Sequence, residues 1–261
     1  MENKLKYNKD KKMKMKRIFG LTIGIGIWGL LSFLLSMNMM NCHTPDSKIQ
    51  LLIVTGGHDF EEAPFFEMFD SFPEISYTVL EDSGTGDPFS FADKNDIGVL
   101  VFYHMTRQIF EDRQATLLKL LEQGKGMIFL HHSLVAYQNW PEFEKIIGGR
   151  YSLDSTQNHS PSTYHEGVDF SLQIVNKNHP ITRGLTDFQV YDEVYGNLAI
   201  QPTVQPLLQT DHPESNRIVA WTNEYRNSRI VYIQPGHGPQ IFGDSNYRKL
   251  LWQAIQWVAQ K

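Results

Sequence analysis

Four short apolar runs, each followed by glycine or polar residues, dominate the hydrophobic pattern of the chain. The runs are Leu51–Thr55, Ile97–Phe102, Met127–Leu130 and Ile230–Ile233. Runs of this length without polar alternation are typical of strands buried on both faces of a parallel sheet. Because ligands of open parallel sheets bind beyond the carboxyl ends of the strands, the residues that follow these runs are candidates for a functional site.

Every one of these runs is followed by histidine. His58, His104 and His237 each follow one run, and His131 and His132 follow Met127–Leu130. Neutral imidazole binds divalent metals and exchanges protons near neutral pH. One histidine after a strand is most often structural, but several at one sheet edge would indicate a site. We expect His58, His132 and His237 to meet there, and we expect His131, which alternates with His132, to point into the fold.

The segments between these runs predict an α/β fold with a mainly parallel central sheet. Helical spacing of apolar residues predicts helices over residues 61–69, 110–123 and 140–147, and a last helix capped by Asp244 or Ser245. Further strands are expected at residues 76–80 and from residue 171 onward, and residues 218–222 and 230–233 should form a hairpin. Residues 81–95 and 150–167 are polar and are expected to be irregular.

The first 45 residues differ from the rest and are expected to be a targeting segment. Residues 1–17 hold eight Lys or Arg and two acids, and residues 18–40 are uncharged and mostly apolar. This order is typical of a signal peptide or an N-terminal membrane anchor, with the following domain outside the cytoplasm. Cys42 comes just after the apolar run, where a bacterial lipoprotein carries its lipidated cysteine. Lipidation, an uncleaved anchor and simple secretion all remain open, and all place the domain across the membrane.

Composition excludes several classes of function for the remaining domain, residues 46–261. The whole chain carries a formal net charge of −5, which leaves this domain strongly acidic because the first residues are basic. An acidic body argues against nucleic acid as a partner. Cys42 is the only cysteine in the chain, so the domain has neither a disulfide nor a cysteine nucleophile. Phosphate-binding and dinucleotide-binding glycine motifs are also absent from the sequence.

Other residues could complete a site built on the histidines. Glu193 follows Asp192 and could be a metal ligand or a general base, although an exposed acidic turn is the alternative. Tyr103, Trp140 and Tyr195 offer rings that could stack on sugars, or that could simply pack in the core. Ser133 lacks the glycine context of a nucleophile elbow.

An ordered set of short motifs resembles the ThuA-like (trehalose utilisation) family. These are Gly56-Gly57-His58, Leu130-His131-His132-Ser133, Asn139-Trp140 with Gly148-Gly149-Arg150, Asn178-His179-Pro180-Ile181, Asp192-Glu193 with Tyr195, and Gly236-His237 before the final helix. The resemblance covers about residues 49–260. It implies a class I glutamine amidotransferase-like fold, a flavodoxin-like three-layer α/β sandwich. It also implies that the amidotransferase cysteine is missing, with His132 near its position, so the chain is not expected to be a glutamine amidotransferase.

The resemblance implies a role in bacterial disaccharide use, on 3-keto sugars supplied by a partner sugar oxidoreductase. Such a protein would be a lyase or hydrolase that uses acid–base or metal-assisted chemistry. The implied roles are catalysis for His132 and Glu193, metal binding for His58 and His237, and substrate binding for Gly57, Tyr103, Trp140 and Tyr195. One departure is that His131 and Ser133 flank His132 where a small residue is expected. The alternative is a non-catalytic carbohydrate-binding or scaffold domain.

Overall fold

The computed structural model describes residues 48–83, 87–155 and 160–260. In these ranges no helix is long and apolar enough to cross a membrane. The expected targeting segment, residues 1–45, and Cys42 within it lie outside the described residues.

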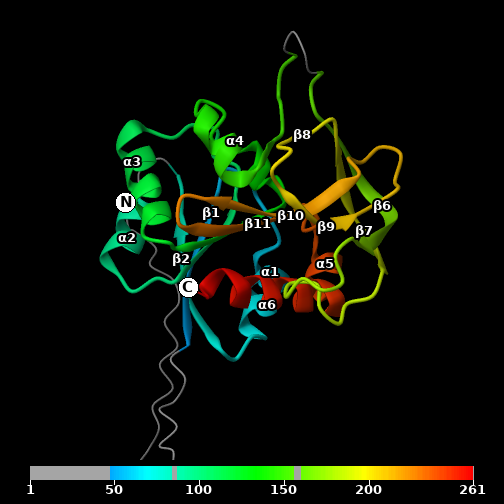
Figure 1. Ribbon diagram of the computed structural model, residues 1–261, viewed down its shortest axis with the longest axis horizontal. Helices are drawn as coiled ribbons and strands as arrows, with labels where there is room; N and C mark the ends of the chain where they lie inside the picture. Colours follow the sequence, from blue (N-terminus) through cyan, green and yellow to red (C-terminus); the bar gives the residue numbers. More distant parts are fainter. Residues whose placement is uncertain (1–47, 84–86, 156–159, 261) are drawn as a thin grey trace, which may run out of the picture. The chain divides into compact units, whose positions relative to one another are not determined.

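A sheet of nine strands forms the middle of the domain, in the order β2-β1-β3-β4-β11-β10-β9-β6-β7 (Figure 1). The strands are β1 (Ile49–Gly56), β2 (Ile75–Glu81), β3 (Val99–His104), β4 (Gly126–Leu130), β6 (Thr163–Ile174), β7 (Phe188–Gly196), β9 (Gln205–Gln209), β10 (Ile218–Tyr225) and β11 (Ser228–Ile233). Two short strands, β5 (Gly149–Arg150) and β8 (Ala199–Ile200), pair separately. β2, β1, β3, β4 and β11 are parallel, and an antiparallel part continues from β11 through β10 to β7.

Helices cover both faces of the parallel strands and so complete three layers. The helices are α1 (Glu62–Asp70), α2 (Pro88–Lys94), α3 (Glu111–Glu122), the 3-10 helix η1 (His131–Val135), α4 (Pro141–Ile147), α5 (Pro239–Gly243) and α6 (Ser245–Ala259). Apolar residues of α1, α5 and α6 pack in one core with Leu51 and Ile53 of β1. Those of α2, α3 and α4 pack in the other core with Leu52 and Val54. Alternate residues of one strand thus serve opposite cores, which explains why its sequence is apolar throughout.

The sequence predictions of the fold class and of most elements are confirmed. The three-layer α/β sandwich is present, and β10 and β11 form the expected hairpin, joined by Arg226 and Asn227. Asp244 caps α6, where its carboxylate accepts hydrogen bonds from the backbone N–H groups of Asn246 and Tyr247. This helix buries its apolar face in the core, as its periodicity predicts.

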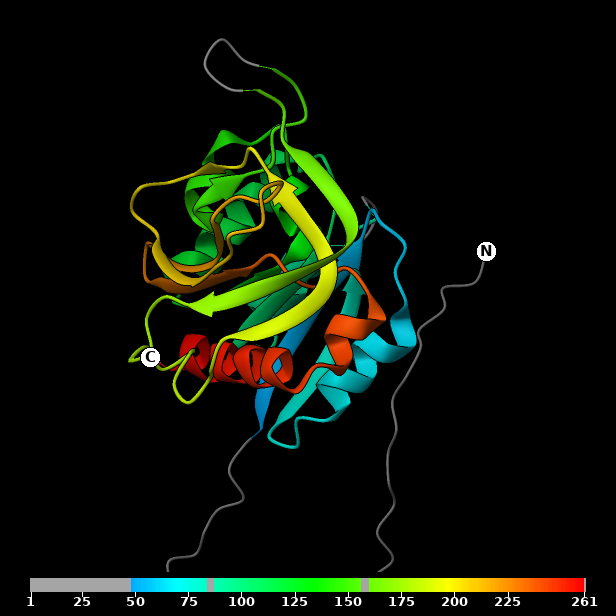
Figure 2. The same ribbon diagram turned by 90° about the vertical axis from the view of Figure 1, so that its right-hand side faces the viewer.

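Two polar segments were wrongly expected to be irregular. Residues 81–95 contain α2, which begins where the Asp87 carboxylate accepts hydrogen bonds from the backbone of Phe89 and Ser90. Residues 163–167 belong to β6, a strand of 12 residues that curves together with β7 as a long antiparallel ribbon (Figure 2). The outer part of β6 is exposed, so its residues follow no apolar alternation. Tertiary pairing, which the local pattern does not encode, makes this part a strand.

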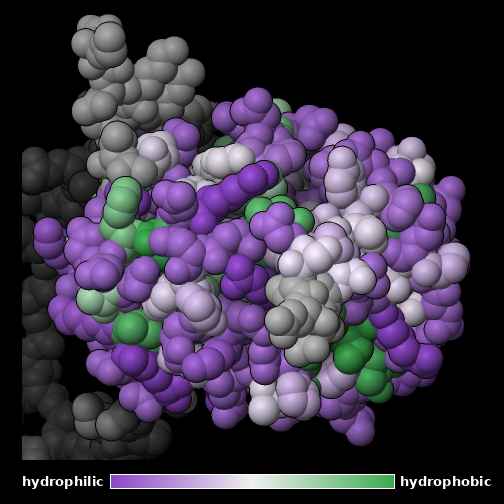
Figure 3. Space-filling view, turned by 90° about the horizontal axis from the view of Figure 1, so that it is seen from above, coloured by the Kyte–Doolittle hydropathy of each residue, from purple (hydrophilic) through white to green (hydrophobic). Residues whose placement is uncertain are grey.

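The carboxyl ends of β1, β3, β4 and β11 lie side by side, because these strands are parallel neighbours in this order. This confirms that the four histidine-bearing segments meet at one edge of the sheet. The face of the molecule in Figure 3 is mainly hydrophilic, with small and separate hydrophobic spots. That face therefore offers no broad apolar surface.

Candidate functional site

A cavity of about 290 Å³ lies beyond the carboxyl ends of β1, β3, β4 and β11. The β6–β7 ribbon supplies its other wall. The described residues that line it are His58, Met105, Arg107, His131, His132, Val135, Tyr151, Leu153, Tyr164, Glu166, Glu193, Tyr195 and His237. Most are polar or aromatic, which suits a small polar ligand better than an apolar one.

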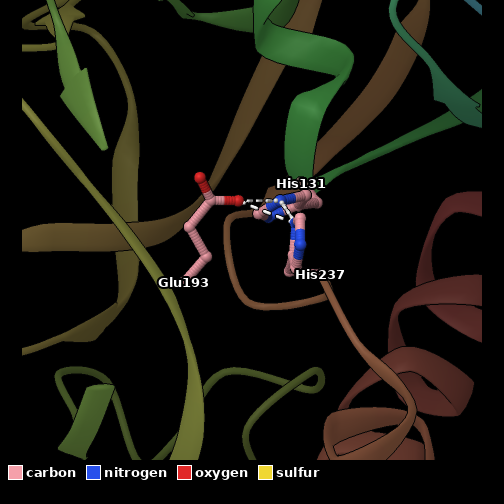
Figure 4. Close-up of side chains that lie close together, drawn as sticks. All are labelled: His131, Glu193 and His237. Carbon is pink, nitrogen blue, oxygen red and sulfur yellow. Dashed lines mark hydrogen bonds and ion pairs between the residues drawn. The ribbon is translucent and has the colours of Figure 1, made fainter. Parts of the chain in front are cut away.

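Three side chains from distant segments converge in this cavity: His131, Glu193 and His237 (Figure 4). Glu193 Oε2 lies 2.8 Å from His131 Nε2 and 2.8 Å from His237 Nδ1, and the two nitrogens are 3.1 Å apart. His131 begins η1, Glu193 is in β7, and His237 follows β11. His131 and Glu193 are buried, whereas His237 is partly exposed. Their donor atoms are close enough together to hold a single metal ion.

The same three groups shift one another's proton affinity. Burial raises the pKa of Glu193, but hydrogen bonds from His131 and His237 outweigh this effect and lower the pKa to about 2. The hydrogen bond with Glu193 raises the pKa of His237 against the opposing effect of burial. Glu193 is therefore ionised at neutral pH, and its tight pairing makes it a poor proton acceptor.

The side chain of His131 lines the cavity, although strand alternation predicts that it points into the fold. The chain leaves β4 at Leu130 and turns into η1, and His131 takes a positive φ of 46°. Its backbone carbonyl accepts a hydrogen bond from the Tyr232 hydroxyl, and its Nδ1 lies 2.7 Å from the carbonyl oxygen of Gln234. These contacts hold the ring so that Nε2 faces Glu193. The period-two rule ends with the strand, so the prediction for His131 was wrong.

His132 lies beside this cluster without belonging to it. Its ring is 4.9 Å from that of His58, in a stacked arrangement, and 4.4 Å from that of Tyr103. The side chain is buried, and neither ring nitrogen has a hydrogen-bond partner among the described residues. Burial, reinforced by the neighbouring histidines, keeps the pKa of His132 well below its usual value. The ring is therefore neutral at physiological pH, and its nitrogens are not committed to a hydrogen bond with any described residue.

The expected substrate-binding residues occupy different places. Tyr195 lines the cavity, and its hydroxyl is 2.9 Å from His131 Nε2. Gly57 lines a neighbouring cavity that shares His58. Tyr103 and Trp140 are not among the described residues that line the histidine cavity. The Tyr103 hydroxyl donates to the carbonyl of Gly236, and the Trp140 ring packs in the core against Phe143.

Asp192, next to Glu193 in β7, holds the loop that carries His237. Its buried carboxylate accepts hydrogen bonds from the backbone N–H groups of Gly236, at 2.6 Å, and His237, at 3.0 Å. Burial raises the pKa of Asp192, although these hydrogen bonds oppose the shift. The Ser133 hydroxyl is likewise committed, because it donates to the carbonyl of Phe102. These two residues therefore support the site without being free to react.

A comparison with models of protein families finds one whose description is ThuA, trehalose utilisation, and it matches residues 50–258. The chain belongs to the ThuA family. Family membership indicates a carbohydrate-related function. A comparison with curated protein sequences found no match.

Solved structures agree with this assignment at the level of the fold. A ThuA-like protein from Parabacteroides merdae superposes with a TM-score of 0.70 at 16% identity, over 82% of this chain and 90% of the other. A ThuA-like protein from Bacteroides uniformis superposes with a TM-score of 0.62 at 20% identity, over 83% of this chain and 93% of the other. A cytoplasmic protein from Salmonella typhimurium superposes with a TM-score of 0.60 at 13% identity, over 81% of this chain and 99% of the other. At these identities the likeness establishes the shared three-layer architecture of the ThuA chain.

Several residues that line the cavity of this ThuA protein cannot be predicted from the sequence. Strand alternation places His131 inside the fold, and no sequence pattern points to Arg107, Tyr151, Tyr164 or Glu166. Tyr164 and Glu166 are two residues apart on one strand, so they share a face, and the strand itself was the missing information. The others lie in segments whose course depends on tertiary structure.

Proposed function

We propose that the chain is an enzyme of carbohydrate catabolism that processes 3-keto glycosides or 3-keto disaccharides by acid–base, metal-assisted chemistry. The observation that carries the proposal is the cavity in which the imidazole of His132, with no hydrogen-bond partner in the described part of the chain, lies beside the cluster of His131, Glu193 and His237. Membership of a family described as trehalose utilisation supports a sugar as substrate.

A ketone at C3 makes the neighbouring C2–H acidic, and this defines the step for a base. His132 takes the C2 proton, the C2–H electron pair forms a C1–C2 double bond, and the C1–O bond breaks with its electrons on the glycosidic oxygen. That oxygen leaves as an alcohol after it gains a proton. Glu193 is paired with two histidines, whereas His132 has no hydrogen-bond partner among the described residues, and this difference favours His132 as the base.

The remaining groups stabilise charge and position the sugar. Negative charge develops on the C3 oxygen as the proton leaves, and a divalent ion held by the histidines and Glu193 would supply Lewis-acid stabilisation of that charge. His58, whose ring stacks on that of His132, would exchange the proton with the leaving oxygen. Tyr151, Tyr164 and Glu166 on the wall of the cavity offer rings and a carboxylate to sugar hydroxyls. Water addition to the resulting enone would complete a hydrolysis.

The substrate would be supplied by an oxidoreductase that oxidises the C3 hydroxyl of a glycoside. The basic and apolar start of the chain supports export with a membrane tether, and therefore a domain on the extracytoplasmic side. The sugar-oxidising partner is accordingly expected on the same side of the membrane, or its product must reach that side.

The test is incubation of the protein with 3-keto-trehalose and 3-keto-glucosides, with product analysis by chromatography and mass spectrometry. Release of the aglycone alcohol or sugar together with the C1–C2 enone indicates a lyase, and release of two free sugars indicates hydrolysis. His132→Ala should abolish turnover and retain sugar binding, whereas His165→Ala, a histidine on β6 outside the cavity lining, should retain turnover. Activity retained in His132→Ala would refute His132 as the base, and binding without turnover in the wild type would instead favour a carbohydrate-binding domain.

A further inference from the structure

We infer that His131, Glu193 and His237 form a divalent transition-metal site with two histidines and one carboxylate on one face of the ion. This set differs from the one expected from the sequence, because His131 takes the place of His58. The inference deepens the proposed function, whose metal-assisted step uses the same cluster. The site can be tested without any sugar, so failure to bind a metal and failure to process a 3-keto sugar are separate results.

The orientation of His131 turns one ring nitrogen toward the cluster. His131 Nδ1 lies 2.7 Å from the carbonyl oxygen of Gln234, and a carbonyl only accepts, so Nδ1 carries a hydrogen. The other nitrogen, Nε2, lies 2.8 Å from Glu193 Oε2, 2.9 Å from the Tyr195 hydroxyl and 3.1 Å from His237 Nδ1. A ring that donates through Nδ1 can offer Nε2 as a metal ligand, and Glu193 Oε2 and His237 Nδ1 are the two other ligand atoms beside it.

The distances within the cluster suit such an ion. Imidazole nitrogen and carboxylate oxygen bind these metals at about 2.0–2.2 Å, so two ligand atoms at right angles lie about 3 Å apart. The three edges of the observed triangle are 2.8, 2.8 and 3.1 Å. Since the three residues line the cavity, the remaining coordination positions would face the space that receives a ligand. Two histidines and one carboxylate with open positions are typical of iron(II) and related divalent ions.

Neighbouring groups fix the orientation of the candidate ligands. The Nδ1–H of His131 donates to a backbone carbonyl, the arrangement that fixes the tautomer of metal-binding histidines. Asp192 holds the backbone of His237 through a hydrogen bond of 3.0 Å. His58 lies farther out, with its ring centre 6.1 Å from that of His237, and its ring stacks on His132. The structure therefore favours His131 over His58 as the third ligand.

The chemistry of the donors limits the metal. Two imidazole nitrogens disfavour magnesium and calcium, which prefer oxygen ligands, and a single carboxylate with no thiolate suits manganese, iron, cobalt or zinc. The ion would bind on the cavity side of the triangle, where it can contact an oxygen of an entering ligand. A sugar with adjacent carbonyl and hydroxyl oxygens is one such ligand.

The experiment is calorimetric titration of the full chain in detergent, after removal of metal with a chelator and dialysis, using Mn²⁺, Zn²⁺ and Mg²⁺ as separate probes. We expect one equivalent of Mn²⁺ or Zn²⁺ to bind and Mg²⁺ to bind much more weakly, with a higher unfolding temperature when Mn²⁺ or Zn²⁺ is present. Glu193→Gln, His237→Gln and His131→Ala should each lower the affinity by about 100-fold or more. Glu193→Gln keeps the shape of the side chain, so it carries the test if His131→Ala does not fold.

Two controls distinguish this site from other histidine pairs. His165→Ala removes a histidine that lies 3.4 Å from Glu214 on the surface, and it should leave the affinity unchanged. His58→Ala should retain the single equivalent. The assignment is overturned if the wild type binds none of these transition metals more tightly than about 1 mM, which would leave a protonated ion pair as the explanation of the cluster. It is equally overturned if Glu193→Gln binds as tightly as wild type, or if His58→Ala abolishes binding.

Discussion

Asp192→Asn should reduce stability substantially, although the two side chains have the same shape. Both carboxylate oxygens of Asp192 accept backbone hydrogen bonds, from Gly236 and His237. Asparagine keeps one acceptor oxygen but turns an NH₂ group toward the second N–H, so one charge-assisted hydrogen bond is lost and two donors face each other. Asp192 is only 5% exposed, so water cannot replace the lost partner.

The size of this effect follows from the two bonds. A hydrogen bond to a charged group contributes about 1.5–3 kcal/mol, and a buried unsatisfied N–H costs about 1–3 kcal/mol. Relief of the buried charge offsets part of this loss. We expect the free energy of unfolding to fall by about 2–4 kcal/mol, measured by urea unfolding with a chelator present so that metal binding does not contribute.

Asp169→Asn is the matched control, because Asp169 is an exposed acid on the neighbouring strand β6. Its effect should stay within about 0.5 kcal/mol. If Asp192→Asn lowers the free energy of unfolding by less than about 1 kcal/mol at an unchanged denaturant dependence, the reasoning that Asp192 anchors the loop is refuted.

Two further predictions concern the backbone at Gly57 and the buried His104. Gly57→Ala should lower the free energy of unfolding in urea by about 2 kcal/mol or more. Gly57 has φ +76°, and a Cβ there would lie 2.6 Å from backbone atoms of Met105 and Thr106. A loss below about 0.5 kcal/mol would contradict this reasoning. Burial lowers the pKa of His104 to about 3. Between about pH 6.5 and about pH 3 the unfolded chain therefore binds a proton that the folded protein does not, so the stability of the fold falls as the pH is lowered. His104→Leu lacks this contribution, so its free energy of unfolding should rise relative to wild type by about 2 kcal/mol between pH 7 and pH 5; a difference independent of pH would exclude a buried, neutral His104.

The sequence was sufficient to predict where the site lies, because its strands are buried on both faces. Continuous apolar runs indicated parallel strands, and parallel neighbours must present their carboxyl ends at one edge. The amphipathic last helix and its Asp244 cap were equally visible, since both signals are local. What could be predicted from the sequence was therefore the fold and the edge of the sheet.

Some of the side chains that line the cavity could be predicted from the sequence, namely His58, His132, Glu193, Tyr195 and His237. His131 could not, because its direction depends on the positive φ that follows β4, which no residue type in the segment indicates. Tyr164 and Glu166 reach the cavity through the pairing of β6 with β7, a contact between segments that local patterns do not encode.

The cluster in the cavity joins parts of the chain that are far apart along it. His131 is 62 residues from Glu193 and 106 residues from His237. These contacts have high contact order, so they become available only once the parallel strands and the β6–β7 ribbon are both in place. A ligand bound there ties three segments together and stabilises only the completed fold. Binding at this cluster would therefore be a property of the whole domain, and a fragment that lacks any one of the three segments would have no such site.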